Sequence, residues 1–332
     1  MSTACRPRPA VSIIIVNWKV RELLRQCLQS IPESTQLPAC DYEIVVVDND
    51  SADGSVEMLQ RDFPAVQVVA NPCNLGFAAA NNQALPLCRG DYLLLLNPDT
   101  LVLPGAIDTM VGKMRADSSL AVLGCRLLNG DRSLQKWTGG AFPTAGNLLS
   151  HYLFLDRIVP ASLRPAPLYL DRDVAGDIDV DWVSGACMML RRSAVTDSIF
   201  DPAFFMYAED MELCHRIRRA GGRVVYTGAV SIVHYQGESM RQQVGEVMLS
   251  SIKGPRMFFA RMHGSSRVWL FDLVTLAGFT LRWIGYSLVS ALGSDMRLRD
   301  RARSSRRHMR IAWQLARSPV PEAGTPNAAR PS

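Results

Sequence analysis

The sequence has no glycine-rich loop of the kind that binds phosphate groups after the first strand of many nucleotide-binding folds. The first strongly apolar run, residues 11–16, leads into Asn17-Trp18-Lys19-Val20, which contains no glycine. The pattern G-x-G-x-x-G occurs nowhere in the chain. These absences exclude a dehydrogenase that binds its dinucleotide through this fingerprint, and they argue against a nucleotidyltransferase.

Cysteine pairs are also missing. The eight cysteines are scattered without any C-x-x-C spacing, so we predict reduced thiols in a cytosolic protein. Residues 1–10 contain no apolar stretch before the first predicted strand, so a secretory signal is not expected. The formal charge of +5 is small for 332 residues and does not indicate a nucleic-acid partner.

No uninterrupted apolar run reaches the roughly 18 to 20 residues that a membrane-spanning helix needs. After residue 255, residues 268–271 and 284–292 belong to one long apolar stretch, which is broken only by Asp272 and Arg282. Seven arginines and a single acid then follow between residues 297 and 310. An apolar helix pair beside a basic block suits an anionic membrane surface, so we predict membrane contact through residues 268–310. The alternative is packing on the domain or on a second subunit of a homodimer.

The sequence does contain a regular alternation of short apolar runs and amphipathic segments from residue 11 to about residue 130. Continuous apolar runs are typical of parallel strands buried on both faces, and alternation with helices predicts a doubly wound α/β sheet. The predicted strands are residues 11–16, 43–48, 66–70 and 91–96, and the predicted helices are residues 20–30, 54–61 and 76–88.

The pattern becomes irregular and rich in proline from about residue 130 to 180, and regular elements return afterwards. We predict a buried strand over residues 183–190, entered through Gly185. The other predicted elements are a helix over residues 206–220, ended by two glycines, and short strands over 224–226 and 230–234.

Polar residues follow three of the predicted strands: Asn17, Asp48 and, after Asn97-Pro98, Asp99. Because open α/β sheets bind ligands beyond the carboxyl ends of their strands, we expect these side chains to form one polar rim. Such a rim suits a nucleotide and a divalent cation, Mg²⁺ or Mn²⁺, since one carboxylate is sufficient beside phosphate oxygens. His234, at the end of a later strand, is either a second ligand of the cation or a structural histidine.

A second pair of carboxylates, Glu209 and Asp210, falls in the first turn of the helix predicted over 206–220. Acids at that place can simply start a helix, because the helix dipole favours negative charge there. The catalytic alternative is that neighbouring Phe205 and Tyr207 partly desolvate a carboxylate, which raises its pKa toward the range of a general base. Such a base would deprotonate an alcohol that attacks an electrophilic carbon.

These features, in this order, resemble the inverting glycosyltransferases of family 2, and in particular their rhamnosyltransferase-like subgroup. The resemblance runs from about Val11 to Ser239 and depends on seven successive blocks rather than on any one of them. The blocks are VSIIIVNW, EIVVVDNDSADGS, NPCNLGFAAANNQAL, DYLLLLNPDT, VSGACMMLRR, FDPAFFMYAEDMELCHRIRRAG and VSIVHYQGES.

The resemblance implies a glycosyltransferase A-type fold, which is a Rossmann-like mixed sheet flanked by helices, here with a C-terminal helical extension that is apolar and basic. The implied division is a disordered N-terminus (1–10), a catalytic domain (11–255), a helical extension (256–317) that would associate with a membrane, and a disordered tail (318–332). Within the catalytic domain, residues 11–130 would bind the nucleotide and residues 131–255 the acceptor.

The resemblance also implies roles for individual residues. Asp210 would be the catalytic base, with Glu209 as the other candidate. The donor nucleotide would contact Val16, Asn17, Asp48, Asn82 and Asp99; the metal would be held by Asp99 and His234; and the acceptor side would be lined by Trp182, Gly185 and Ala186.

Three positions depart from the family pattern. Asn97 takes the first place of the frequent Asp-x-Asp metal motif, a substitution that this subgroup shares. The sequence before the aromatic segment, 198–201, lacks the glycine of the usual Gly-Phe-Asp, and Glu212 replaces an aspartate. None of these changes removes a proposed catalytic group.

The implied reaction is transfer of a sugar from a nucleoside-diphosphate donor, with inversion at the anomeric carbon and without a covalent enzyme intermediate. The subgroup favours dTDP-L-rhamnose as the donor, with UDP-hexoses as the alternative. The acceptor would be a glycan or a polyprenyl-diphosphate-linked glycan, in cell-envelope polysaccharide synthesis at the inner face of the cell membrane. A non-catalytic nucleotide-sugar or carbohydrate-binding protein is the competing interpretation, which the intact Glu209-Asp210 pair disfavours.

Overall fold

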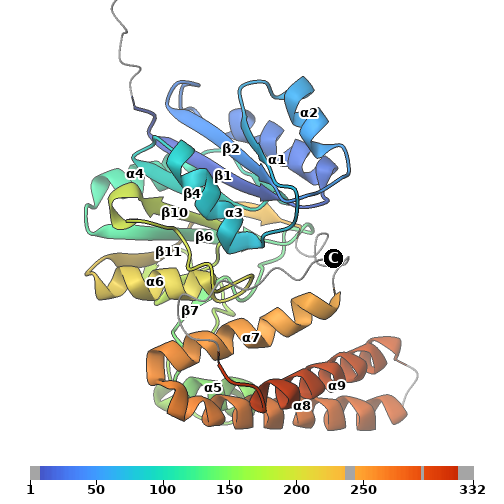
Figure 1. The fold of residues 1–332 in the computed structure, drawn as a ribbon. Helices are drawn as coiled ribbons and strands as arrows, with labels where there is room; N and C mark the ends of the chain where they lie inside the picture. Colours follow the sequence, from blue (N-terminus) through green and yellow to red (C-terminus); the bar gives the residue numbers. More distant parts are fainter. Residues whose placement is uncertain (1–7, 236–243, 293–294, 321–332) are drawn as a thin grey trace, which may run out of the picture.

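A mixed β-sheet forms the centre of the computed structural model, which describes residues 8–235, 244–292 and 295–320 (Figure 1). Its strand order is β3-β2-β1-β4-β10-β6-β11-β5, and β8 pairs with β11 outside this path. The strands are β1 (Val11–Asn17), β2 (Tyr42–Asp48), β3 (Gln67–Ala70), β4 (Tyr92–Leu96), β5 (Thr100–Val102), β6 (Leu120–Leu128), β8 (Asp177–Asp179), β10 (Cys187–Arg191) and β11 (Arg223–His234). A separate pair joins β7 (Gly139–Gly140) to β9 (Trp182–Val183).

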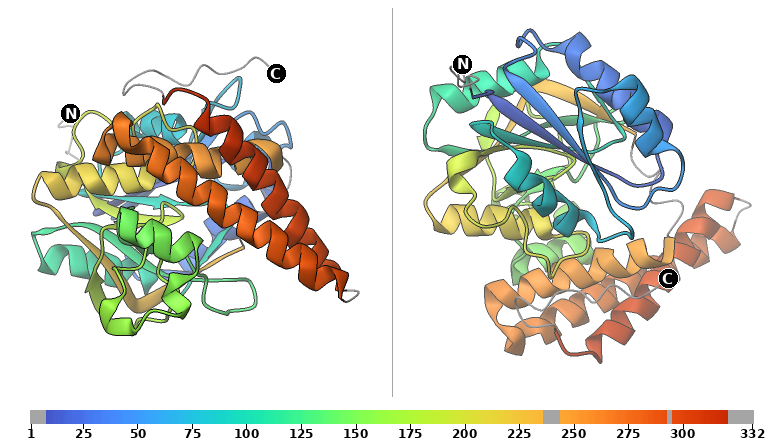
Figure 2. Two further views of the ribbon diagram at one scale, coloured as in Figure 1. Left: turned by 90° about the horizontal axis from the view of Figure 1, so that it is seen from below. Right: turned by 45° about the horizontal axis from the view of Figure 1, so that its top comes forward.

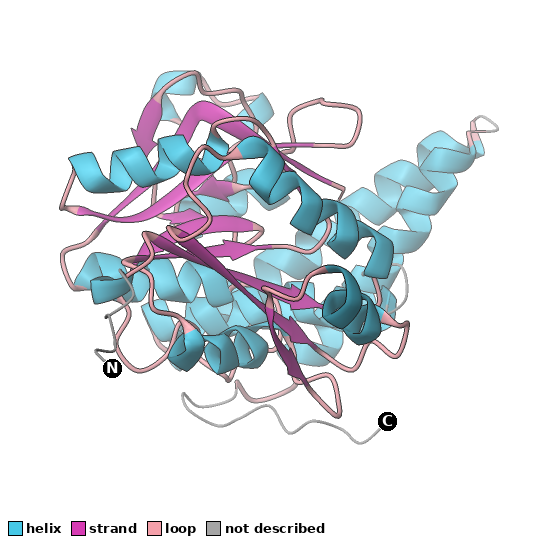
Figure 3. Cartoon of the chain, turned by 90° about the horizontal axis from the view of Figure 1, so that it is seen from above, coloured by secondary structure: helices cyan, strands magenta, loops and turns pink. Residues whose placement is uncertain are grey.

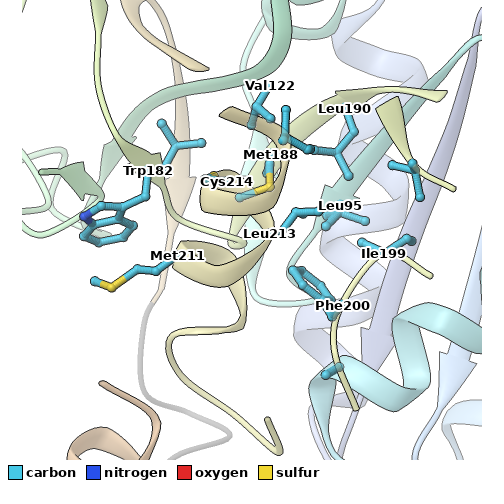
Figure 4. Packing of buried hydrophobic residues seen from close by; sticks show 14 of the residues in the cluster. Leu95, Val122, Trp182, Met188, Leu190, Ile199, Phe200, Met211, Leu213 and Cys214 are labelled. Carbon is cyan, nitrogen blue, oxygen red and sulfur yellow. The ribbon is translucent and has the colours of Figure 1, made fainter. Parts of the chain in front are cut away.

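Helices cover the sheet, as the view from above shows (Figure 3). The sheet separates two buried apolar clusters, one on each of its faces. Figure 4 shows part of one cluster, in which residues of α6 pack beside β4, β6 and β10. The helices are α1 (Arg21–Ser34), α2 (Ser55–Asp62), α3 (Phe77–Ala84), α4 (Ala106–Ala116), α5 (Ala145–Tyr152), α6 (Glu209–Arg219), α7 (Val244–His263), α8 (Val268–Ala291) and α9 (Met296–Ala316).

The first half of the chain confirms the predicted α/β alternation. Strands β3, β2, β1 and β4 are parallel neighbours, and their carboxyl ends lie at one edge of the sheet. Every residue of β1 and β4 is buried, which is why both read as unbroken apolar runs. In register, Asn17 at the end of β1 lies opposite Asp48 at the end of β2.

The strand predicted over 183–190 is wrong as a single element. The structure divides it into β9 and β10, with a turn at Ser184, Gly185 and Ala186 between them. The turn forms because its peptide groups bond outside the sheet ladder, to Asp210 and to Asn97. β10 then runs antiparallel to both β4 and β6 and lies between them.

The two short strands predicted over 224–226 and 230–234 are in fact one strand, β11. Its register against β6 shifts between Thr227 and Ser231, so the strand bends at an irregularity instead of ending. Gly228 sits at this bend, where an added Cβ would lie 1.4 Å from the carbonyl oxygen of Val174. The glycine is therefore needed for close backbone approach, and in the sequence it looked like a break.

The helix predicted from residue 206 begins later, at Glu209. Tyr207 and Ala208 have φ angles of +68° and +65°, in the left-handed region, and they turn the chain sharply before α6. The turn places Glu209 and Asp210 in the first helical turn, as predicted. The salt bridge between Glu212 and Arg216 lies on the same helix at 3.2 Å.

The C-terminal extension is helical, as predicted, and packs against α5 below the sheet domain. The interruption predicted within 268–292 is absent: α8 is continuous, and the segment 265–291 is long and apolar enough to cross a membrane by length and composition. Arg282 fits inside the helix because its guanidinium donates to the carbonyl oxygens of His151 and Tyr152. Parts of the predicted disordered ends, residues 1–7 and 321–332, and of the last family block, residues 236–239, lie outside the described residues.

Candidate active site

The polar rim predicted at the ends of β1 and β2 is built around Asn17. Its side-chain nitrogen donates to the Asp48 carboxylate at 2.8 Å and to the Ser51 hydroxyl at 3.0 Å. The Asp48 carboxylate also accepts the peptide N–H of Ser51 at 3.0 Å. The other side-chain atom of Asn17, Oδ1, is buried without a hydrogen-bond partner among the described residues. A buried acceptor of this kind is costly unless a ligand supplies a donor, so it marks a place for one.

The second part of the rim is Asp99, which lies against His234. His234 Nε2 is 3.2 Å from Asp99 Oδ1 and 3.2 Å from Asn97 Nδ2, and both acidic and imidazole side chains are buried. His234 Nδ1 is 2.8 Å from Gln135 Oε1. The amide nitrogen of Gln135 donates to Asn129 Oδ1 and to the His234 carbonyl, which leaves Gln135 Oε1 as an acceptor for the Nδ1 proton.

This arrangement fits a divalent cation. With the proton on Nδ1, His234 Nε2 is an acceptor that can take a hydrogen bond from the Asn97 amide and lies 3.2 Å from Asp99 Oδ1. A cation would satisfy Nε2 and the Asp99 carboxylate together. The described residues contain no group of three or more His, Cys, Asp or Glu side chains suited to a metal. A pair of protein ligands is nevertheless enough for Mg²⁺ or Mn²⁺, whose other positions are taken by water and phosphate oxygens. The ligand roles of Asp99 and His234 stay predictions.

The second carboxylate pair lies at the start of α6. Burial, together with the neighbouring charge of Asp210, raises the pKa of the Glu209 carboxyl well above its usual range. Burial also raises the pKa of Asp210, to about 6, although hydrogen bonds from peptide N–H groups, among them that of Gly185 at 3.3 Å, hold it lower than burial alone would. Glu209 Oε2 is buried and has no partner among the described residues. An Asp carboxylate with this pKa is ionised at neutral pH yet basic enough to accept a proton.

One turn connects the two parts of the site. The peptide N–H of Gly185 donates to Asp210 Oδ2, and the carbonyl of the next residue, Ala186, accepts the N–H of Asn97 at 2.9 Å. Asn97 in turn contacts His234 beside Asp99. A single backbone turn therefore connects Asn97, which follows β4, with Asp210 of α6, and His234 of β11 contacts Asn97.

The remaining predicted site residues are placed as follows. Val16 is buried in β1, one residue before Asn17. Asn82 in α3 binds the backbone of Phe200 through both ends of its amide, at 2.7 and 2.9 Å, which gives it a structural role. Trp182 is buried in the cluster of Figure 4, and its indole N–H has no partner among the described residues. Nucleotide binding by Val16 and Asn82, and acceptor binding by Trp182, Gly185 and Ala186, remain predictions.

Sequence reasoning missed two polar groups of the site. Gln135 lies in the proline-rich stretch that showed no periodic pattern, so nothing there indicated a partner for His234. Asn49 was recognised as a polar residue after a strand but was given no role, and its side chain bonds to Asn71, Asn74 and the Gly76 carbonyl. A useful signal was available in Asn49, since it directly follows a strand-end aspartate in the predicted rim.

Comparison with known sequences gives a consistent result. The model of the family described as glycosyl transferase family 2 matches residues 12–198, more than half of the chain. An N-acetylglucosaminyl-diphospho-decaprenol L-rhamnosyltransferase of Mycobacterium tuberculosis is 25% identical over 312 residues, covering 89% of this chain and 95% of that protein. Rhamnosyltransferase WbbL of Escherichia coli is 24% identical over 260 residues, covering 76% of this chain and 93% of its own.

Solved structures agree on the fold. A mannosyltransferase from Pyrobaculum calidifontis, PcManGT in complex with GDP-Man and Mn²⁺, superposes with a TM-score of 0.56 at 17% identity, covering 93% of this chain and 87% of that one. GalNAc-T7 with UDP, GalNAc and Mn²⁺ gives a TM-score of 0.50 at 15% identity, covering 77% of this chain and 51% of its own. The architecture is thus the glycosyltransferase A-type fold, as predicted, with the C-terminal apolar helix appended.

Proposed function

Because the chain belongs to glycosyl transferase family 2 and is therefore a glycosyltransferase, we propose that it transfers a deoxyhexose, L-rhamnose first among the candidates, from a nucleoside-diphosphate donor to a hydroxyl of a lipid-linked glycan. The donor sugar is supported by the names of the two rhamnosyltransferases, which align over most of their length. The acceptor class is supported by the decaprenol-diphosphate substrate in the name of the mycobacterial relative. A role in cell-envelope polysaccharide synthesis on the cytoplasmic side of the membrane follows from such an acceptor.

The observation that carries the proposal is the turn that contacts both carboxylate sites, the one at Asp99 and the one at Asp210. Inverting transfer needs a leaving-group site and a base on opposite sides of one anomeric carbon. Gly185 N–H bonds to Asp210, and Ala186 C=O bonds to Asn97 beside the Asp99–His234 pair. The link of both carboxylate sites to consecutive residues of one turn supports the proposal that they act on one bound substrate.

Three groups of residues have separate roles in the proposed reaction. The Asn17 and Asp48 side chains, with the unpartnered Asn17 Oδ1, would bind donor groups of the nucleoside. Asp99 and His234 would hold a divalent cation, which when bound neutralises charge that develops on the leaving diphosphate. Asp210, accepting the Gly185 N–H, would remove the proton of the acceptor hydroxyl as its oxygen attacks the anomeric carbon.

The proposal is tested by ligand binding and by turnover. The melting temperature of the full chain is measured with dTDP-L-rhamnose, UDP-glucose, UDP-galactose and UDP-N-acetylglucosamine, each with and without Mn²⁺. A ligand present at a hundred times its Kd stabilises the native state by about 2.7 kcal/mol, so binding is visible as a higher melting temperature. We expect the largest Mn²⁺-dependent rise with dTDP-L-rhamnose, and no such rise for Asp99→Asn.

The same panel distinguishes the alternatives. A Mn²⁺-dependent rise with a UDP-hexose alone overturns the choice of donor and keeps the enzyme class. Transfer is then followed with a radiolabelled donor and a polyprenyl-diphosphate N-acetylglucosamine acceptor, and the anomeric configuration of the product is read by NMR. Retention of configuration contradicts the inverting mechanism. Donor binding without transfer to any of a series of lipid-linked acceptors favours the binding-protein interpretation.

A further inference from the structure

The outer side of α8 carries a stripe of exposed apolar side chains. Trp269 and Leu288, near the two ends of the helix, are each 63% exposed. At 100° per residue, the exposed members fall on one side of the helix. We call this set the α8 stripe; it consists of Trp269, Leu273, Leu281, Ile284 and Leu288, and Leu292 continues it just after the helix ends.

A row of arginines lies next to this stripe. α9 packs along α8, and Figure 2 shows the two helices side by side, seen from below in the left view. Residues 295–320 contain eight arginines, two aspartates and no lysine or glutamate. All eight arginines are exposed. The α8 stripe is therefore flanked by a surface of strongly positive charge.

The inner side of α8 is fixed to the protein by polar contacts. Asp272 forms a buried two-point salt bridge with Arg256 of α7, at 2.7 and 3.0 Å. Arg282 donates to the carbonyl oxygens at the end of α5, and the guanidinium groups of Arg301 and Arg306 of α9 lie over the rings of Tyr286 and Trp283 of α8. A bilayer-spanning α8 would have to take Asp272 and Arg282 into hydrocarbon, away from these partners.

From these contacts we infer that α8 lies flat on an anionic lipid surface, with the α8 stripe in the acyl boundary and the α9 arginines at the headgroups. Apolar burial and attraction of basic residues to anionic lipid are the two forces that bind a helix in this orientation. Charge complementarity favours lipid over a second copy of the chain, because a symmetric dimer would bring two arginine rows together. The inference concerns lipid binding alone and holds whatever sugar the site transfers.

The test is flotation of the full chain, without nucleotide sugar, with vesicles of phosphatidylcholine and with vesicles that also contain phosphatidylglycerol. We expect flotation with the anionic vesicles, loss of most binding in high salt, and little binding to phosphatidylcholine alone. Leu281→Ser with Leu288→Ser should weaken binding at least tenfold. Arg297→Gln, Arg299→Gln and Arg310→Gln together should weaken it up to about a hundredfold, from roughly a factor of five per charge.

Matched controls make the same changes away from the α8 stripe. Leu163→Ser and Arg172→Gln are also at exposed positions and should leave flotation unchanged. All five residues that the test changes on α8 and α9 are exposed, and melting temperatures check that each variant folds.

Several results would overturn the inference. It fails if anionic vesicles do not bind the chain, or if both the leucine and the arginine variants bind as well as the wild type. It also fails if light scattering shows a dimer that the leucine substitutions dissociate while vesicles remain unbound, because the stripe would then be a subunit interface. Finally, a chain that only detergent can remove from membranes, and not high salt or alkaline wash, would indicate that α8 spans the bilayer.

Discussion

Gln135 Oε1 lies 2.8 Å from His234 Nδ1, although the two residues come from distant parts of the chain. An acceptor at this position favours a proton on His234 Nδ1, and in the neutral ring Nε2 then faces Asp99 as an acceptor. The amide of Gln135 is itself held by Asn129 and by the His234 carbonyl, so the ring has one preferred orientation.

Removing this contact should weaken metal binding. We expect Gln135→Ala to lower the affinity for Mn²⁺ by about 10- to 100-fold, the usual cost of losing a partner that orients a metal-bound histidine. The measurement is Mn²⁺ titration by electron paramagnetic resonance in the presence of a nucleoside diphosphate. Gln36→Ala, an exposed glutamine elsewhere, serves as the control and should have no effect. Unchanged Mn²⁺ affinity in Gln135→Ala would contradict the role of Gln135 in orienting a metal-bound His234.

Asp210→Asn should abolish turnover while donor binding is retained. The amide keeps the shape of the carboxylate, but its one oxygen can accept only one of the two peptide N–H groups, of Gly185 and Met211, that the carboxylate accepts. Because the amide also cannot take a proton, we expect kcat to fall by about 10²- to 10⁴-fold. Calorimetric titration with the donor should give the wild-type Kd. The companion variant Glu209→Gln should stay active; the reverse result would make Glu209 the base.

The rate of the wild-type enzyme should depend on pH through the same group. Because Asp210 must be ionised to act as a base and burial raises its pKa to about 6, kcat should rise with pH through about 6 and then level off. A kcat that is flat across this range while chemistry limits the rate would argue against a base with this pKa.

The Glu209 side chain should lower the free energy of unfolding at neutral pH. Its carboxyl has a raised pKa in the folded chain, because burial and the Asp210 charge disfavour ionisation. The folded chain is therefore most stable, with respect to Glu209, below the pKa that this carboxyl has in the unfolded chain. The free energy of unfolding falls as pH rises from there through the folded-state pKa. We expect Glu209→Gln to raise the free energy of unfolding at neutral pH by about 1 kcal/mol and to flatten its decline with pH.

Differential scanning calorimetry from mildly acidic to mildly alkaline pH measures both effects. Glu57→Gln, on the exposed side of α2, is the matched substitution and should change stability by less than about 0.5 kcal/mol. If Glu209→Gln is less stable than the wild type at neutral pH, the Glu209 carboxylate has a stabilising partner and the prediction is wrong.

Gly76→Ala should disturb the segment that leads into α6. Gly76 has a φ of +85°, and an added Cβ would lie 2.5 Å from a ring carbon of Phe205 and 2.8 Å from its carbonyl oxygen. That carbonyl accepts the N–H of Phe77, which ties α3 to the chain just before Glu209 and Asp210. We expect a loss of about 1–3 kcal/mol in stability together with reduced turnover.

Gly112→Ala is the control for the same substitution, and it should raise stability where Gly76→Ala lowers it. Gly112 lies within α4, and no atom stands within 4 Å of an added Cβ, so alanine should raise stability by about 0.5–1 kcal/mol. Urea unfolding measures both variants. Equal effects in the two would show that the contact with Phe205 is unimportant.

The rim of the site was predictable because it follows from strand order. A buried parallel strand is recognisable in the sequence as an apolar run, and ligands bind beyond the carboxyl ends of such strands. Asn17, Asp48 and Asp99 could therefore be grouped from the sequence alone. Asp210 could be found because two acids at a helix start stood beside aromatic residues.

The parts that could not be predicted depend on contacts between distant segments. Gln135 has no local signal, since only the returning strand β11 brings His234 to it. Arg282 looked like a break in an apolar segment because its carbonyl partners lie in α5. The turn at Gly185 looked like a continuous strand because its hydrogen bonds go to Asn97 and Asp210, which are remote in the sequence.

The position of β10 has a consequence for how specificity can change in this fold. β10 comes from the second half of the chain but fills the gap between β4 and β6 of the first half. A polypeptide ending near residue 130 would leave two open sheet edges, which invite aggregation. A chimera that joins the halves of two relatives would therefore have to preserve the pairing of β10 with both β4 and β6, whereas a change in the loops leaves this pairing untouched.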